Sequence, residues 1–233
     1  MTPYEDKTFK DTMKEERTKL KDMSWKDKIW YIWEYYKFPI IGVVLAVFLV
    51  GSIGTAVYNN RFDTAISFVV INSQYPSEEV AADEYFDQGF RQYIGLDENT
   101  RIDVDYSMSL SFDTETMTEY TYAQLAKITA IIASKELDVM ISTPDTIDHY
   151  GSMGGFTDLR DILPDDLYEQ VEDRLYTVTA EETGEQTVCG ILLDAEDFSE
   201  KTDLTLKTPI FTIVSNTTRP DTAVALIRYI LEE

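Results

Sequence analysis

Cysteine and histidine are almost absent from this chain, which contains one of each. A single cysteine excludes an intrachain disulfide and a cysteine-based metal cluster. Cys189 lies in an apolar run, and no basic neighbour in the sequence would lower the pKa of its thiol, so we expect it to be buried and inert. His149 has no serine or cysteine nucleophile motif around it, so we expect a surface or capping residue rather than a catalytic base.

Positive charge is scarce in most of the chain, whose formal net charge is −23. Residues 1–38 hold nine basic and eight acidic residues, whereas residues 61–233 hold 11 basic and 35 acidic residues. A domain with that balance repels nucleic acid and an anionic membrane surface, because it has few cations to offer to phosphates. Its acidity is explained by solubility alone, or by an encounter with cations or a basic partner.

Catalytic and metal-binding motifs are also missing. The glycine-rich residues 151–155 lack the Lys-Ser/Thr pair that must follow in a phosphate-binding loop. A hydrolase would need a carboxylate pair in a cleft, and so many acids make a chance pair easy to propose. We therefore expect no enzyme, no cofactor and no metal. Two groups of acidic residues lack the spacing of a Ca²⁺-binding loop, and we interpret them as solvated surface. They are Asp113 with Glu115 and Glu119, and Asp158 with Asp161.

One long hydrophobic run contrasts with these absences. Residues 39–58 carry no charge, and about 20 helical residues match the roughly 30 Å hydrocarbon core of a membrane. This run predicts a head at 1–38, a transmembrane helix at 39–58 and an extracytoplasmic domain at 61–233. A cleaved signal peptide is the alternative, with Gly54 and Ala56 at the cleavage site, but its leader would be untypically long and aromatic.

The residues before the hydrophobic run predict an amphipathic helix. Ser24 followed by Asp27 is typical of a helix start, and residues 1–23 are expected to form a mobile or loosely helical lead. The apolar face of the predicted amphipathic helix comprises Trp25, Ile29, Ile32, Trp33 and Tyr36. This face predicts an aromatic belt at the membrane surface or, alternatively, a helix packed on a partner.

Basic residues near the two ends of the run predict its orientation. The twenty residues before Pro39 contain five basic residues, all lysines, whereas the twenty residues after Tyr58 contain one basic residue, Arg61. Cytoplasmic flanks carry the excess of lysine and arginine, so we expect a single-pass protein of the cell membrane with a cytoplasmic N-terminus and an extracytoplasmic C-terminal domain. The lipid bilayer is then its first partner.

The residues beyond the run predict alternating strands and helices. Strands separated by helices imply parallel crossovers, so we expect an α/β domain whose sheet is covered on both sides. Residues 101–111 alternate most clearly between apolar and polar side chains, and 175–179 with 187–193 predict a hairpin. The other strands are expected at 63–72, 137–142 and 209–214, and helices from 77 to 94, over 119–136, from 144, from 164 to about 171 and from 220.

Hydrogen-bonding residues follow two of the expected strands. Ligands of open α/β sheets bind beyond the carboxyl ends of strands, which makes Asn72 and Ser73 candidates after the first strand. Ser142, Thr143 and Asp145 are candidates after the third strand. The alternative is that all five are turn and cap residues, because these residue types abound there for local reasons.

Several segments of residues 133–223 are similar to extracellular solute-binding proteins of ABC importers. In that family a "G-x-x-P/L-D-V" stretch leads into a strand and a "G-x-L-x-D-L" loop follows, where this chain has ELDV at 136–139 and GFTDL at 155–159. The segment 187–194 resembles the family's hinge strand without its proline. The segment 213–223 resembles its "S-x-N-P-E-A-A" approach to a late helix.

The resemblance implies a reduced domain, like a single lobe of such a protein. The chain between 159 and 209 is too short for a second lobe, and the family's lipid-bearing N-terminal cysteine is missing. The aromatic head before a spanning helix also resembles uncharacterised single-pass proteins of Gram-positive bacteria. We therefore expect a membrane-anchored binding or interaction module, with a small solute, an ABC transporter or another membrane complex as partner. The alternatives are a structural or accessory subunit and a cell-surface hydrolase.

Overall fold

The computed structural model describes residue 18 and residues 23–59, 63–75, 81–113, 117–181 and 183–232. The chain divides into two compact units, Met1–Arg61 and Phe62–Glu233. Several predicted features lie outside the described residues: nearly all of the lead at 1–23, the charge of Arg61, the start of the helix expected from 77, Glu115, and position 182 in the hairpin turn.

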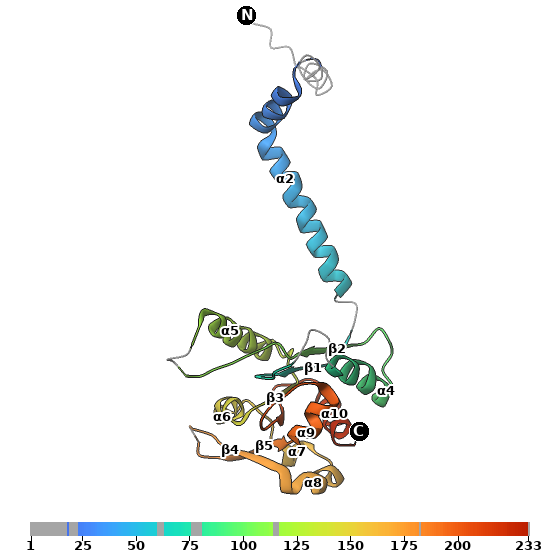
Figure 1. Cartoon of the computed structure of the whole chain (residues 1–233), viewed down its shortest axis with the longest axis vertical. Helices are drawn as coiled ribbons and strands as arrows, with labels where there is room; N and C mark the ends of the chain where they lie inside the picture. The colour runs from blue at the N-terminus through green and yellow to red at the C-terminus, as the bar shows by residue number, and fades with distance from the viewer. Residues whose placement is uncertain are drawn as a thin grey trace, which may run out of the picture. The chain divides into compact units, whose positions relative to one another are not determined.

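Helix α2 (Trp25–Asn59) is a continuous helix of 35 residues (Figure 1). It begins as the sequence predicts, because the Asp27 N–H donates to Ser24 Oγ at 3.4 Å and Ser24 Oγ donates to Asp27 Oδ2 at 2.6 Å. Pro39 lies inside this helix rather than at its start. Proline lacks an N–H, so one helical hydrogen bond is missing there. The stretch Tyr36–Thr55 is long and apolar enough to cross a membrane, by length and composition alone.

The second unit is a mixed α/β domain built on a six-stranded sheet in the order β2-β1-β3-β6-β5-β4. Strand β1 is parallel to β2 and β3, whereas β6 is antiparallel to both β3 and β5, and β4 is antiparallel to β5. The strands are β1 (Thr64–Val70), β2 (Arg101–Asp105), β3 (Val139–Ser142), β4 (Leu175–Thr179), β5 (Gln186–Leu192) and β6 (Ile210–Ile213).

The expectation of parallel crossovers holds for the first three strands and is wrong beyond β3, because helices separate β3 from β4 and yet β4, like β6, runs opposite to β3 and β5. Helix α9 (Ala195–Thr202), which was not predicted from the sequence, lies between β5 and β6. It connects β5 and β6 as a direct return between neighbouring strands instead of a crossover, and Leu193 N–H donates to Pro209 O where the two strands meet. The sequence does contain an N-cap residue for α9, because the Asp194 carboxylate accepts the backbone N–H groups of Glu196 and Asp197 at the start of the helix. The hairpin of β4 and β5 is confirmed.

Apolar clusters fill both faces of the sheet. Strand β1 sends Phe68 and Val70 to one cluster and Val69 to the other, which Ile71 joins directly after the strand, so both faces of the strand are covered. Helices α5 and α6 lie on one side of the sheet, and α4 and α10 lie on the other (Figure 1). The helical segments are α3 (Ala81–Asp83), η1 (Glu84–Gly89), α4 (Phe90–Ile94), α5 (Glu119–Ala133), α6 (Pro144–Ser152), α7 (Leu159–Ile162), α8 (Asp165–Val171), η2 (Glu172–Arg174), α9, and α10 (Pro220–Glu232).

The strand expected over 101–111 ends early, at Asp105. Strict alternation would keep its apolar side chains on one face, but the chain changes face after Tyr106. Ile102 and Val104 pack against the cluster of α4 and α10, whereas Met108 and Leu110 belong to the cluster of α5 and α6. Residues 106–113 therefore form a loop at the end of β2, beside the carboxyl end of β1.

Candidate solute-binding groove

A cavity of about 750 Å³ begins where the parallel strands β1 and β3 end. The connection that leaves the carboxyl end of β1 packs on one face of the sheet, through Phe86 and Phe90, and the connection that leaves β3 packs first on the other face, through Ile147 of α6. Neighbouring strands whose connections leave in opposite directions form a topological switch point, which is where open α/β sheets bind ligands. The volume lies within the range of small-molecule sites.

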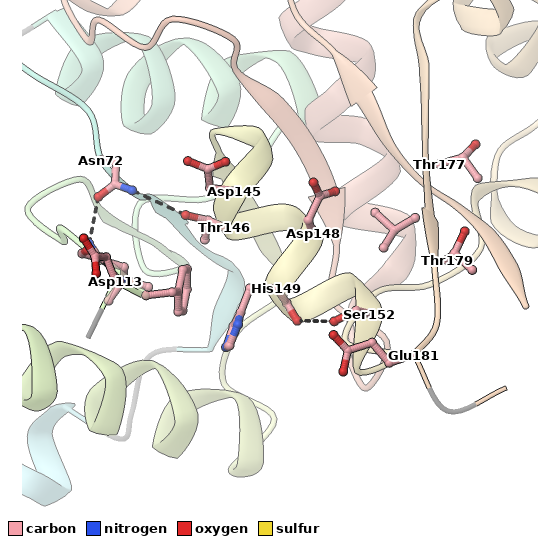
Figure 2. Close-up of a pocket in the computed structure, with 14 residues that line it drawn as sticks. Asn72, Asp113, Asp145, Thr146, Asp148, His149, Ser152, Thr177, Thr179 and Glu181 are labelled. Atoms are coloured by element: carbon pink, nitrogen blue, oxygen red, sulfur yellow. Dashed lines mark hydrogen bonds between the residues drawn. The ribbon is translucent and has the colours of Figure 1, made fainter. Parts of the chain in front are cut away.

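Helix α6 forms the length of this groove (Figure 2). Asp145, Asp148, His149 and Ser152 follow one another at i, i+3, i+4 and i+7, so they share one helical face, and all four line the groove. Seven residues of helix correspond to about 10 Å. The groove therefore extends from the carboxyl ends of β1 and β3 along α6 towards β4, where Thr177, Val178 and Thr179 line it.

Asn72 holds one wall of the groove in place. Its backbone has a φ of 65°, a left-handed conformation that asparagine tolerates better than most residues. Its side-chain oxygen accepts the N–H of Leu110 at 2.8 Å and the hydroxyl of Ser109 at 3.3 Å. Its amide donates to Thr146 Oγ1 at 3.4 Å, and Thr146 is only 1% exposed (Figure 2). Asn72 thus joins the loop after β2 to the first turn of α6.

An aromatic stack closes the middle of the groove. The rings of Phe112 and His149 are stacked with centroids 3.8 Å apart, and Tyr150 meets His149 edge-on at 5.1 Å. Partial burial lowers the pKa of His149 below its usual 6.5, although the nearby carboxylate of Glu181 opposes this shift. The imidazole is therefore neutral at pH 7, and it adds a flat apolar surface rather than a positive charge.

The groove is acidic. Four carboxylates line it, those of Asp113, Asp145, Asp148 and Glu181, and none of the lining residues that the structure describes is a lysine or arginine. Asp148 accepts the hydroxyl of Tyr176 at 2.8 Å, and burial together with this bond raises the pKa of Tyr176 to about 12. The buried floor includes Leu110, Thr146 and Val178. The groove therefore combines a hydroxyl-bearing and apolar floor with negative charge along its length.

Two of the five predicted ligand-binding residues line the groove, namely Asn72 and Asp145. Ser142 is fully buried and donates to Ile71 O at 3.2 Å, and Ser73 donates to Tyr106 O at 3.1 Å. Thr143 occupies the position before α6 without a side-chain capping bond. The hydroxyls of Ser142 and Ser73 therefore bond carbonyls 71 and 33 positions away, and of these three residues only Thr143 stands at a cap position.

The sequence analysis missed most of the groove. Asp148, His149 and Ser152 could have been found from their helical spacing with Asp145, which sets a polar face on α6. Thr177, Thr179 and Glu181 come from a hairpin far along the chain, and nothing local to them signals a ligand site.

Two segments that carry the resemblance to solute-binding proteins meet at the amino end of β3, opposite the groove. Asp138, which is 0% exposed, accepts the Arg219 Nε–H and the Ser67 N–H, each at 2.8 Å, and the Thr217 hydroxyl. The Arg219 guanidinium also donates to Thr64 O at 3.3 Å and Glu136 O at 3.2 Å. We interpret this cluster as a structural clamp, because every described bond in it ties strands, loops and the start of α10 together.

Other candidate groups have local partners. Asp158 caps α7 by accepting Arg160 N–H, and it pairs with the Arg160 guanidinium, which holds the pKa of its carboxyl below the usual value. Among the described residues, no three His, Cys, Asp or Glu side chains lie close enough together to hold a metal ion. Cys189 is buried as expected, and burial raises the pKa of its thiol to about 12, so the thiol is protonated and unreactive at pH 7.

The fold and groove define a mixed α/β domain with a switch-point cavity, in a chain that also carries one helix able to cross a membrane. Comparisons of the chain with protein-family models, with curated proteins and with solved structures found no match.

Proposed function

We propose that this protein is a single-pass membrane protein whose extracytoplasmic domain binds a small polar solute in the groove along α6. The observation that carries the proposal is the position of the groove, since a cavity of about 750 Å³ begins at the switch point between β1 and β3. Asn72, Ser152 and the β4 threonines offer hydrogen bonds, and the aromatic stack offers an apolar surface.

The anchor supports a function at the cell surface. The apolar stretch of α2 keeps a solute-binding domain at the membrane, where a transporter or another membrane complex would take over the solute. The resemblance of residues 133–223 to solute-binding proteins agrees with such a role. The exposed aromatic residues of α2, including Trp25, Trp30 and Trp33 at 77, 67 and 60% exposure, suit lipid headgroups or a neighbouring membrane helix.

The proposal is tested by thermal unfolding of the full chain in detergent micelles against a library of small polar solutes. A solute present at about 100 times its Kd stabilises the folded state by about 2.7 kcal/mol, which should raise the Tm by roughly 5 °C or more. Thr177→Trp places an indole in the groove from an exposed position on β4 and should abolish the shift.

The matched control is Thr129→Trp, which adds the same side chain at an exposed position of α5 outside the groove residues. It should leave the solute-induced shift intact. A library without a single stabilising solute, or a shift that survives Thr177→Trp unchanged, contradicts binding in this groove.

A further inference from the structure

We infer that the ligand of the groove is a linear organic cation that carries two or more ammonium groups. The inference rests on the solute-binding function proposed above and adds the chemical class of the solute. It stands on the shape of the cavity and on the distribution of charge along it.

Charge along the groove selects a cation. Asp113 and Asp145 lie towards the strand ends, and Glu181 lies at the β4 end with Asp148 between them (Figure 2). None of the described residues that line the groove is a lysine or arginine. An anionic solute would meet repulsion at every position, whereas an ammonium group can bind carboxylates by charge-assisted hydrogen bonds. The acidic balance of the whole domain adds a field of the same sign.

The shape of the groove selects an extended ligand. The groove follows α6 from Asp145 to Ser152, a distance of about 10 Å along the helix. Its carboxylates are spread along this length instead of converging on one point, and no group of three described metal-ligating side chains is close enough for a metal ion. Separate positive charges on a flexible chain match separate carboxylates, which a single compact cation cannot do.

The middle of the groove suits the methylene chain of such a ligand. The stacked rings of Phe112 and His149 and the buried side chains of Leu110 and Val178 are apolar surfaces between the charged ends. The Ser152 hydroxyl, which donates to His149 O, leaves its oxygen at the same surface as an acceptor for amine N–H groups.

The test compares three four-carbon solutes with different end groups: putrescine with two ammonium groups, 1,4-butanediol with two hydroxyls and succinate with two carboxylates. Isothermal titration calorimetry on the full chain in detergent should detect saturable binding of putrescine, tighter binding of the longer spermidine, and none of butanediol or succinate. The Asp145→Asn/Glu181→Gln double variant should weaken putrescine binding roughly tenfold. Raising NaCl from 50 to 500 mM should weaken it further, because salt screens partly exposed charges.

The matched control is Asp161→Asn/Glu200→Gln, which removes the same two charges from exposed positions outside the groove residues. It should bind putrescine as the unchanged protein does. Binding of butanediol or succinate that Thr177→Trp abolishes would overturn the cation inference and leave solute binding in place. Absence of binding by putrescine and spermidine overturns the inference, and absence of any ligand in the wider library overturns the proposed function as well.

Discussion

Asp138 is the carboxylate on which the amino end of β3 depends. It is completely buried, yet it has three donors, the Arg219 guanidinium, the Ser67 N–H and the Thr217 hydroxyl. A buried charge with this many partners is tolerated only while all of them remain, since losing one leaves the others desolvated and unpaired. Its position in the chain links β1, β3 and the start of α10.

We predict that Asp138→Ala lowers the free energy of unfolding by about 3 kcal/mol, because Arg219 and the Ser67 N–H lose a buried acceptor. The pair of Asp87 and Arg91 on adjacent turns provides the contrast, since its carboxylate is 53% exposed. Asp87→Ala should cost less than about 1 kcal/mol. Urea unfolding of both variants by circular dichroism measures the difference, and similar costs for the two would show that the Asp138 cluster is not a clamp.

Residue-level reasoning from the sequence was right where the cause is local. Ser24 with Asp27 begins α2, the helix expected to end at 94 does end at Ile94, before Gly95 with its φ of 69°, and Cys189 is buried. It did not identify Asp138 as a buried partner of Arg219, because the two residues are 81 positions apart and an aspartate before a strand is usually exposed.

Helix α10 and the helical segment before β2 pack more closely than their sequences suggest. A Cβ atom added to Gly89 would overlap the Tyr229 hydroxyl, which donates to Tyr85 O at 3.0 Å. Gly89 lies in the π-helical turn η1 between α3 and α4. The wider turn and the missing side chain together let the ring of Tyr229 approach the helix backbone.

Gly89→Ala should therefore destabilise the domain by about 1–3 kcal/mol, despite the better helix propensity of alanine, because the new methyl group displaces Tyr229. Gln88→Ala, at the exposed neighbouring position, should change stability by less than about 0.5 kcal/mol. Tyr229→Phe removes the hydroxyl, so combining it with Gly89→Ala should cost less than the sum of the two single changes. Additive costs in this double-mutant cycle would contradict the steric explanation.

The helices and strands differ in how well their bounds could be predicted from sequence patterns. The apolar run predicted a spanning helix at 39–58, close to the apolar stretch Tyr36–Thr55 of α2. The alternating pattern of 101–111 predicted a longer strand than β2, because alternation does not reveal that the chain changes face after Tyr106. Helix α9 was missed because eight polar-rich residues give too short a periodic signal.

For the whole protein, charge and hydropathy still determine the orientation that we expect in the membrane. The five lysines before Pro39, against the single basic residue Arg61 in the twenty residues after Tyr58, predict a cytoplasmic head, and the domain expected outside the cell carries the 35 acids. Protease added to intact cells should then cut within 62–233 and spare an epitope tag at residue 1. A tag that intact cells lose while the domain stays whole would mean the opposite orientation, and both binding proposals would then concern a cytoplasmic solute.

The amino-acid sequence by itself determined the features that depend on neighbouring residues: the apolar run, the start of α2, the hairpin, the mixed α/β class and the acidic balance. These follow from periodicity, capping and composition, which act over a few turns or along one strand. Only the tertiary structure decided the antiparallel course of β6, the burial of Asp138 against Arg219, and the groove along α6. Those features join segments from Asn72 to Glu181 and beyond, and they are selected by packing on the two faces of one sheet, which no local pattern encodes.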